Sequence, residues 1–181
     1  MDLNLTVAEE AFRQQVANWM KENLPREWKR PRFEVFPPDD DTAVICRKWQ
    51  EKLGAAGWLG LSWPTEYGGR GATMMEQVIF MAEAAAAGAP APLDGMGLNM
   101  VGPALIEMGT PEQKARFLSP ILRGQMVWCQ GFSEPNAGSD LAGLQTKAAL
   151  DGDHWVVNGQ KTWSSYGPWA DWCALLARTS R

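Results

Sequence analysis

The spacing of apolar residues changes near Met126, and this change limits the chain to a helical part followed by a part built from short strands. Upstream, apolar residues recur at the three- to four-residue period of an amphipathic helix. Three of the expected helices open with a capping box, in which a Thr precedes a Glu or Gln by three positions: Thr6 with Glu9, Thr73 with Glu76, and Thr110 with Gln113. Downstream, short apolar runs lie between the turn signals Asp151-Gly152 and Asn158-Gly159. The sequence therefore predicts an α+β fold with segregated helices and strands.

The same patterns give the extent of each element. We expect helices over residues 6–24, 42–56, 73–87, 98–108 and 110–120, with Pro120 and Gly124 closing the helical part. The expected buried face of the second helix is Val44, Ile45, Trp49, Leu53 and Ala56. Strands are expected over residues 126–132, 145–150, 154–157, 160–165 and 172–178. An all-helical domain over residues 1–125 is thus predicted to precede the first part of an antiparallel β domain over residues 126–181.

Composition excludes several classes of protein. Hydrophobic residues make up 45% of the 181-residue chain and charged residues 21%, which is typical of a globular protein. The net charge of −4 gives no electrostatic footprint for nucleic acid. Apolar runs stay far short of the roughly 20 residues that span a bilayer, and no signal peptide is visible at Met1. We expect a cytoplasmic protein that binds neither nucleic acid nor membrane.

Cysteine and tryptophan usage favours packing roles. Cys46, Cys129 and Cys173 are far apart and have no metal-ligand or disulfide spacing, so we expect no metal site and small buried thiols. The chain has 10 Trp. Most of them are expected in the core, because large aromatic side chains bury much area per residue.

Two polar segments of the expected β domain carry the clearest chemical signal. Residues 132–140 read Phe-Ser-Glu-Pro-Asn-Ala-Gly-Ser-Asp, and residues 161–165 read Lys-Thr-Trp-Ser-Ser. If the second segment is a strand, Trp163 and Ser165 share one face. An aromatic plane beside a hydroxyl, near a loop rich in amides and hydroxyls, suits a flat heteroaromatic ring with a phosphate tail.

These two segments resemble those of the acyl-CoA dehydrogenase family, in which both contact FAD. Further motifs follow in family order along nearly the whole chain. Residues 63–69, Trp-Pro-Thr-Glu-Tyr-Gly-Gly, resemble the family's Pro-x-Glu-Tyr-Gly-Gly turn. Residues 109–114, Gly-Thr-Pro-Glu-Gln-Lys, resemble a helix start of the family, and residues 158–161, Asn-Gly-Gln-Lys, resemble the hairpin before its Trp.

The resemblance implies an FAD-dependent oxidoreductase of fatty acid β-oxidation type, which converts an acyl-CoA to a 2-enoyl-CoA. It further implies an electron-transfer flavoprotein as electron acceptor and a homo- or hetero-oligomer. The family's C-terminal four-helix bundle, which supplies the catalytic Glu, is absent from this sequence. An alternative remains open: a non-catalytic subunit or interaction module that keeps half of the flavin site in a heteromeric relative. The acyl group, whether fatty, branched or steroid, stays undetermined.

The resemblance also places individual residues at the cofactor. Gln130, Phe132 and Ser133 are expected along the pyrimidine side of the flavin. Gly138 and Ser139 are expected beside the FAD pyrophosphate and the CoA arm, so Ser139 is also a candidate substrate ligand. The remaining pair, Trp163 and Ser165, is expected against the isoalloxazine ring and near its N5 nitrogen.

No residue of the chain matches the family's catalytic base. Glu66 lies in an expected surface turn, and the match of Glu134 to its motif implies a structural carboxylate. His154, the only His, lies in an expected solvated hairpin. We therefore name no catalytic residue and expect the 181-residue chain alone to be inactive.

Overall fold

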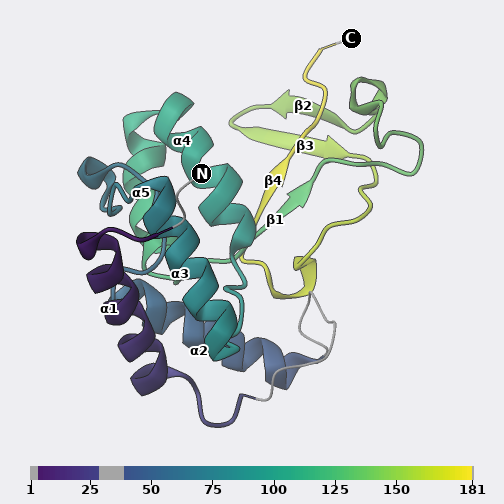
Figure 1. Ribbon diagram of the computed structural model, residues 1–181. Coiled ribbons are helices and arrows are strands. Elements are labelled where there is room, and N and C mark those ends of the chain that lie inside the picture. Colours follow the sequence, from purple (N-terminus) through teal and green to yellow (C-terminus); the bar gives the residue numbers. More distant parts are fainter. Residues whose placement is uncertain (1–3, 29–38, 181) are drawn as a thin grey trace. The chain divides into compact units, whose positions relative to one another are not determined.

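The computed structural model describes residues 4–28 and 39–180, and the chain divides into two compact units, Met1–Gln125 and Met126–Arg181 (Figure 1). The first unit is helical, with α1 Val7–Asn23, α2 Asp40–Ala55, η1 Thr65–Tyr67, α3 Met74–Ala87, η2 Gly97–Val101, α4 Gly102–Met108 and α5 Pro111–Leu122. The second contains β1 Trp128–Gly131, η3 Leu141–Gly143, β2 Lys147–Asp151, β3 His154–Asn158, η4 Gly167–Trp169 and β4 Trp172–Leu175. The predicted segregation of helices and strands is confirmed. Among the described residues, no helix is long and apolar enough to cross a bilayer.

The predicted capping boxes are all formed. In α1, α3 and α5 the Thr side chain accepts the N–H of the third helical residue, whose side chain accepts the N–H of the Thr. Helix α3 ends at Gly88, which has a φ of 68°. One boundary differs from expectation, since α2 begins at Asp40, where Asp39 caps it. Helix α5 ends at Leu122, between the predicted closing residues Pro120 and Gly124. Only Ile121 and Leu122 of α5 follow Pro120, so the missing N–H affects only the end of the helix.

The prediction of which α2 residues are buried is partly wrong. Trp49 and Leu53 are buried as expected, but Val44 is 51% exposed, and Ala43, Cys46 and Gln50 are buried in its place. The Gln50 side chain explains why the buried face differs, because both its amide nitrogen and its amide oxygen are hydrogen-bonded inside the unit. Its Nε2 donates to the Gly124 carbonyl at 3.0 Å, and its Oε1 accepts the Asp94 N–H at 2.7 Å. A polar side chain is buried at low cost when its hydrogen bonds are made.

Indole groups tie down the chain that follows α3. Trp28 Nε1 donates to the Gly88 carbonyl at 2.7 Å, and Trp49 Nε1 donates to the Pro90 carbonyl at 2.9 Å. Trp63 Nε1 reaches the Leu98 carbonyl, in the π-helical turn η2, at 3.0 Å. Each bond satisfies a backbone acceptor that lies where regular helix geometry ends or is interrupted. Only Trp49, Trp58, Trp63 and Trp128 of the 10 Trp are buried, so the prediction that most of them lie in the core is wrong.

The strands pair in two separate ladders. β2 and β3 form an antiparallel hairpin in which Asp151 lies opposite His154, and Gly152 takes a φ of 62° in the turn. β1 and β4 instead pair in parallel, with Trp128 opposite Trp172. An antiparallel arrangement was predicted for all strands. The difference arises because residues 160–165 form no strand, so the chain returns to β1 along a long irregular path.

Gly102 should be among the glycines of the helical unit that tolerate no side chain. A Cβ at this position would lie 1.9 Å from the Trp63 ring, whereas a Cβ on Gly95 would meet nothing within 4 Å. We expect Gly102→Ala to lower the free energy of unfolding by about 1–3 kcal/mol through overpacking. The matched change Gly95→Ala should leave it unchanged or raise it by roughly 0.5–1 kcal/mol. Urea unfolding of both variants measures this, and equal stabilities would contradict the packing argument.

Candidate functional site

The residues that the sequence singles out lie on three segments of the second unit. Gln130 is in β1, and Phe132 and Ser133 directly follow that strand. Gly138 and Ser139 lie in the exposed loop before η3, and Trp163 and Ser165 lie in the connection between β3 and β4.

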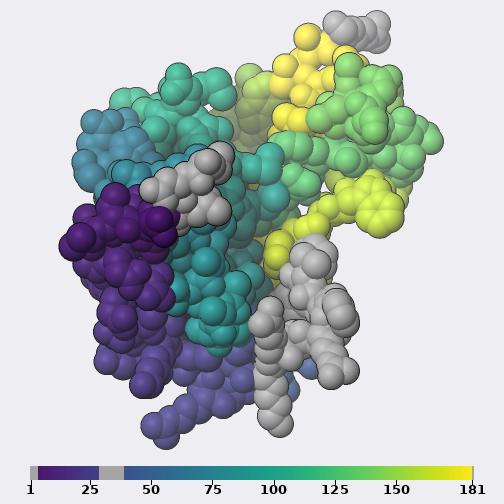
Figure 2. All heavy atoms as spheres, in the orientation of Figure 1, coloured from purple at the N-terminus to yellow at the C-terminus, as the bar shows by residue number. Residues whose placement is uncertain are grey.

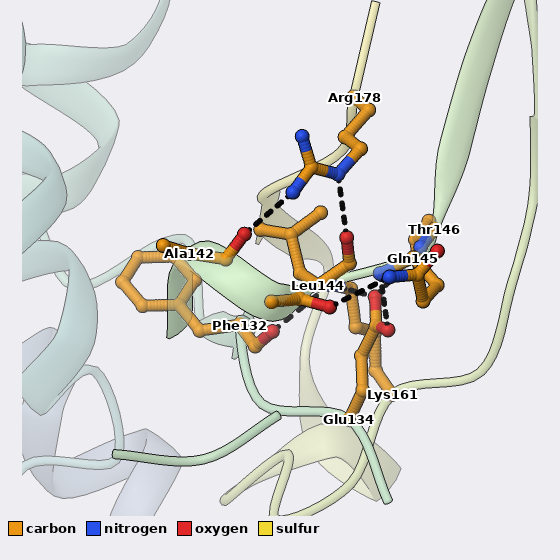
Figure 3. Close-up of polar contacts among 9 residues, drawn as sticks. Phe132, Glu134, Ala142, Leu144, Gln145, Thr146, Lys161 and Arg178 are labelled. Carbon is orange, nitrogen blue, oxygen red and sulfur yellow. Dashed lines mark hydrogen bonds and ion pairs between the residues drawn. The ribbon is translucent and has the colours of Figure 1, made fainter. Parts of the chain in front are cut away.

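Two of these segments are joined directly. The Thr162 N–H donates to the Ser133 carbonyl at 2.9 Å. Lys161 Nζ donates to the Phe132 carbonyl, also at 2.9 Å (Figure 3). The structure therefore brings together the segment after β1 and the segment that leads into Trp163, although they are far apart in the sequence.

The Glu134 carboxylate is the centre of this junction. Its Oε1 accepts the Thr146 N–H at 2.8 Å and Lys161 Nζ at 2.9 Å, and its Oε2 accepts the Gln145 N–H at 2.6 Å (Figure 3). The side chains of Glu134 and Lys161 are only 7% and 11% exposed. The sequence predicted a structural carboxylate here, and these contacts fit that interpretation. Hydrogen bonds from Thr146, from Gln145 and from Lys161 stabilise the charged form and lower the pKa of Glu134 to about 2.

The loop that carries Gly138 starts from a tight turn. Glu134 and Ala137 exchange backbone hydrogen bonds of 2.8 and 3.1 Å. Beyond the turn, a Cβ on Gly138 would meet nothing within 4 Å, so the surface there is open. Downstream, the Arg178 guanidinium donates to the carbonyls of Ala142 and Leu144 and holds the end of the loop (Figure 3).

The expectation that Trp163 and Ser165 share a strand face is wrong. Trp163 has a φ of 59°, Tyr166 has a φ of 63°, and the Ser165 N–H donates to the Trp163 carbonyl at 2.9 Å. This is a turn, because Lys161 and Thr162 are bonded to the segment after β1 and make no ladder. Trp163 nevertheless projects into solvent, with 84% of its surface exposed. A non-glycine residue with positive φ is uncommon and marks a constrained turn.

The donor chemistry of these segments fits a flavin. Within the described part of the chain, the hydroxyls of Ser133, Ser139 and Ser165 make no hydrogen bond to the protein, so they are open to a ligand. An exposed indole and an open glycine lie on the same segments. The described residues contain no cluster of His, Cys, Asp and Glu suited to a metal ion.

Sequence reasoning overlooked two residues that organise the site. Lys161 belongs to the Asn-Gly-x-Lys motif, but no role was assigned to it. Arg178 lies in an expected strand, and no sequence pattern indicated a role for it in the site. Their partners are mainly backbone carbonyls of distant segments, which a sequence pattern does not reveal.

The helical unit contains an apolar pocket of about 510 Å³. Trp49, Trp58 and Trp63 line it, together with Ala84 and Ala85 of α3. Small residues on one wall and aromatic residues on another leave room for a ligand, and the volume lies in the range of small-molecule sites, roughly 300–1,000 Å³.

The acid stability of the protein should depend on Glu134. The folded pKa of about 2 lies below the ordinary value of 4.5. Its stabilising contribution is therefore complete above about pH 4.5 and is lost as the pH falls towards 2. We expect Glu134→Gln to be less stable than the parent at pH 6, with a difference that narrows through this window. Urea midpoints across the pH range check this, and a constant difference would contradict it.

Comparison with known proteins places these features in a family. Residues 6–125 match the model of the acyl-CoA dehydrogenase N-terminal domain, and residues 129–181 match that of the acyl-CoA dehydrogenase middle domain. Acyl-CoA dehydrogenase IpdE1 of Mycobacterium tuberculosis is 45% identical over 173 residues, covering 95% of this chain and 45% of its own. The chain therefore spans about half the length of the curated relatives it matches.

Solved structures agree with the sequence comparison. The Tcur3481–Tcur3483 steroid ACAD superposes with a TM-score of 0.84 at 38% identity, over 99% of this chain and 45% of that one. The ChsE4–ChsE5 complex from Mycobacterium tuberculosis gives a TM-score of 0.80 at 38% identity, with the same coverage. Matching domains, relatives and architecture all lead to one conclusion: the chain belongs to the acyl-CoA dehydrogenase family.

Proposed function

We propose that the protein takes part in the FAD-dependent conversion of an acyl-CoA to a 2-enoyl-CoA. Family membership supports the reaction type. The observation that carries the proposal is the junction of the two candidate flavin segments through Thr162 and Lys161. It holds uncommitted hydroxyls and an exposed indole on neighbouring stretches of one compact unit.

Each segment has a proposed role at the cofactor. When bound, FAD supplies the acceptor for the hydride that leaves the β carbon of the acyl group. Gln130, Phe132 and Ser133 line the pyrimidine side, where N–H and O–H donors stabilise negative charge on the reduced ring. The indole of Trp163 covers the ring face, and Ser165 lies near N5.

The exposed loop serves the phosphate groups. Gly138 lets the pyrophosphate approach the backbone closely, because its surroundings are open. The Ser139 hydroxyl donates either to a phosphate or to the CoA arm, which makes Ser139 the proposed substrate contact. In the helical unit, the apolar pocket lined by Ala84 and Trp58 holds the acyl group.

The proposal includes a steroid-derived acyl group and an assembly of two different chains. Both are suggested by two similar structures, a steroid ACAD and the ChsE4–ChsE5 complex. An electron-transfer flavoprotein is the proposed electron acceptor.

A second candidate function is a subunit that holds half of the flavin site while its partner supplies the base. The heteromeric relative favours this candidate, and substrate-dependent dye reduction separates the two.

The purified chain with added FAD should retain flavin absorbance but should not be bleached by an acyl-CoA, because none of its residues matches the catalytic base. Together with a partner that supplies the base, it should be bleached anaerobically by an acyl-CoA with a bulky alicyclic acyl group. Ala84→Leu narrows the pocket and should raise the KM at least about 10-fold, since overpacking costs roughly 1–3 kcal/mol. Ala86→Leu is the matched control, because Ala86 is exposed on the same helix and does not line the pocket. Bleaching that requires the partner favours the half-site subunit, bleaching of the chain alone rejects it, and an unchanged KM in Ala84→Leu with the partner present rejects the pocket.

Trp163 and Trp172 should separate cofactor binding from folding. Trp163 is 84% exposed, whereas Trp172 stacks on Trp128 with ring centroids 5.8 Å apart. Trp163→Ala should weaken FAD binding about 5- to 10-fold, because an aromatic pair contributes roughly 0.5–1.5 kcal/mol beyond burial. Its unfolding free energy should change by less than about 0.5 kcal/mol, as for other exposed positions.

Trp172→Ala is expected to give the opposite result, because it removes the stacked partner of Trp128. The β unit should lose about 1–3 kcal/mol of stability, while the folded fraction keeps its FAD affinity. Flavin fluorescence titration and urea unfolding measure the two quantities. If Trp163→Ala binds FAD as the parent does, the flavin is not placed against this side chain.

A further inference from the structure

We propose that the buried pair Glu134–Lys161 is a positioning clamp that fixes the two flavin-facing segments against each other. The inference rests on the proposed flavin site and deepens it, since neither residue is itself placed at the cofactor. The segment after β1 carries Ser133, and the segment after β3 carries Trp163. Their separation decides whether one ring can be hydrogen-bonded from one side and covered from the other.

Lys161 is suited to this role because its side chain and the backbone that follows it both bond to the segment after β1. Its Nζ donates to the Phe132 carbonyl and to Glu134 Oε1, both at 2.9 Å. Its backbone leads directly into Thr162, whose N–H donates to the Ser133 carbonyl at 2.9 Å. Side chain and backbone therefore fix the segment at two successive carbonyls, which restricts both its distance and its direction.

Glu134 holds the Lys161 ammonium group in place through the second of its hydrogen bonds. Its carboxylate cannot follow a moving ammonium group, because the N–H groups of Gln145 and Thr146 already fix both oxygens, at 2.6 and 2.8 Å. The clamp thus joins three stretches of chain: the residues after β1, the residues before β2 and the segment that contains Lys161 (Figure 3). Charge-assisted hydrogen bonds in a mostly buried site are strong and directional.

The ion pair also explains why Trp163 can stay exposed in a strained turn. Residues in sparsely populated backbone regions persist only when their surroundings over-determine them. Trp163 has a φ of 59° and 84% of its surface in solvent, so packing does not hold it. The bonds of Lys161 and Thr162 directly upstream supply the restraint on one side, and the Ser165 N–H supplies it on the other.

The test compares Lys161→Met and Glu134→Gln with the matched control Lys147→Met, which removes an exposed Lys of the same unit. Amide hydrogen exchange measures the effect of the clamp on the backbone in the absence of FAD. We expect the Thr162 N–H to exchange at least about 10-fold faster in both clamp variants, as for loss of a bond to a charged group. The Val156 N–H in the β2–β3 ladder should be unchanged, because the hairpin does not depend on the clamp.

The second measurement is the dissociation constant for FAD, from flavin fluorescence on the purified protein. It should rise about 10-fold or more in each clamp variant and stay at the parent value in Lys147→Met. The double variant Glu134→Gln/Lys161→Met should lose no more than the worse single variant, since the two side chains act as one unit.

Each other outcome counts against a specific claim. If the parent binds FAD and the clamp variants bind it equally well, the inference fails and the proposed flavin site stands. The same holds if Thr162 exchanges at the parent rate. If Val156 loses protection together with Thr162 in both Lys161→Met and Glu134→Gln, the pair is a general fold stabiliser and the inference also fails. If the parent binds no FAD, the proposed flavin site fails and the inference with it.

Discussion

A single carboxylate, that of Glu134, accepts hydrogen bonds from three donors and joins three stretches of the second unit. Its donors come from the chain before β2 and from the connection between β3 and β4, while Glu134 itself follows β1. Apolar burial among the described residues of this unit is limited to Val127, Trp128, Cys129 and Ala137, and every residue of β3 is exposed. With little apolar burial, placement of the segments depends on a few directional polar bonds. Such bonds determine geometry more than they raise stability.

The helical unit uses a different means to the same end. Its core contains tryptophans whose ring faces pack while their N–H groups donate to carbonyls of irregular backbone, as in Trp49 with Pro90 and Trp63 with Leu98. One side chain therefore contributes burial and a directed hydrogen bond. This permits the chain from Gly88 to Asp94 to run without regular structure between α3 and η2.

The elements that could be predicted from sequence are those specified locally. Thr6, Thr73 and Thr110 each bond to a residue three positions away, so a short window contains all of the relevant chemistry. The hairpin at Gly152 was predicted for the same reason. The failures concern residues whose conformation is decided at long range. Residues 160–165 read as a strand, yet Lys161 and Thr162 bond to the segment after β1 and turn the chain at Trp163. Gln50 was not among the residues of the predicted buried face, yet two distant backbone groups make it a core residue.

The parallel pairing of β1 with β4 has a consequence for synthesis on the ribosome. Trp128 pairs with Trp172, and the hairpin of β2 and β3 lies wholly within the connection between them. During translation the hairpin can close as soon as His154 to Asn158 has emerged, whereas β1 must wait for nearly all of the unit. Pairing of this kind is slow because the conformational entropy of a long loop is lost before any stabilising contact between the strands forms. In the interval β1 is a nascent strand with free edges, and Trp128 and Cys129, both buried in the finished unit, are accessible to chaperones.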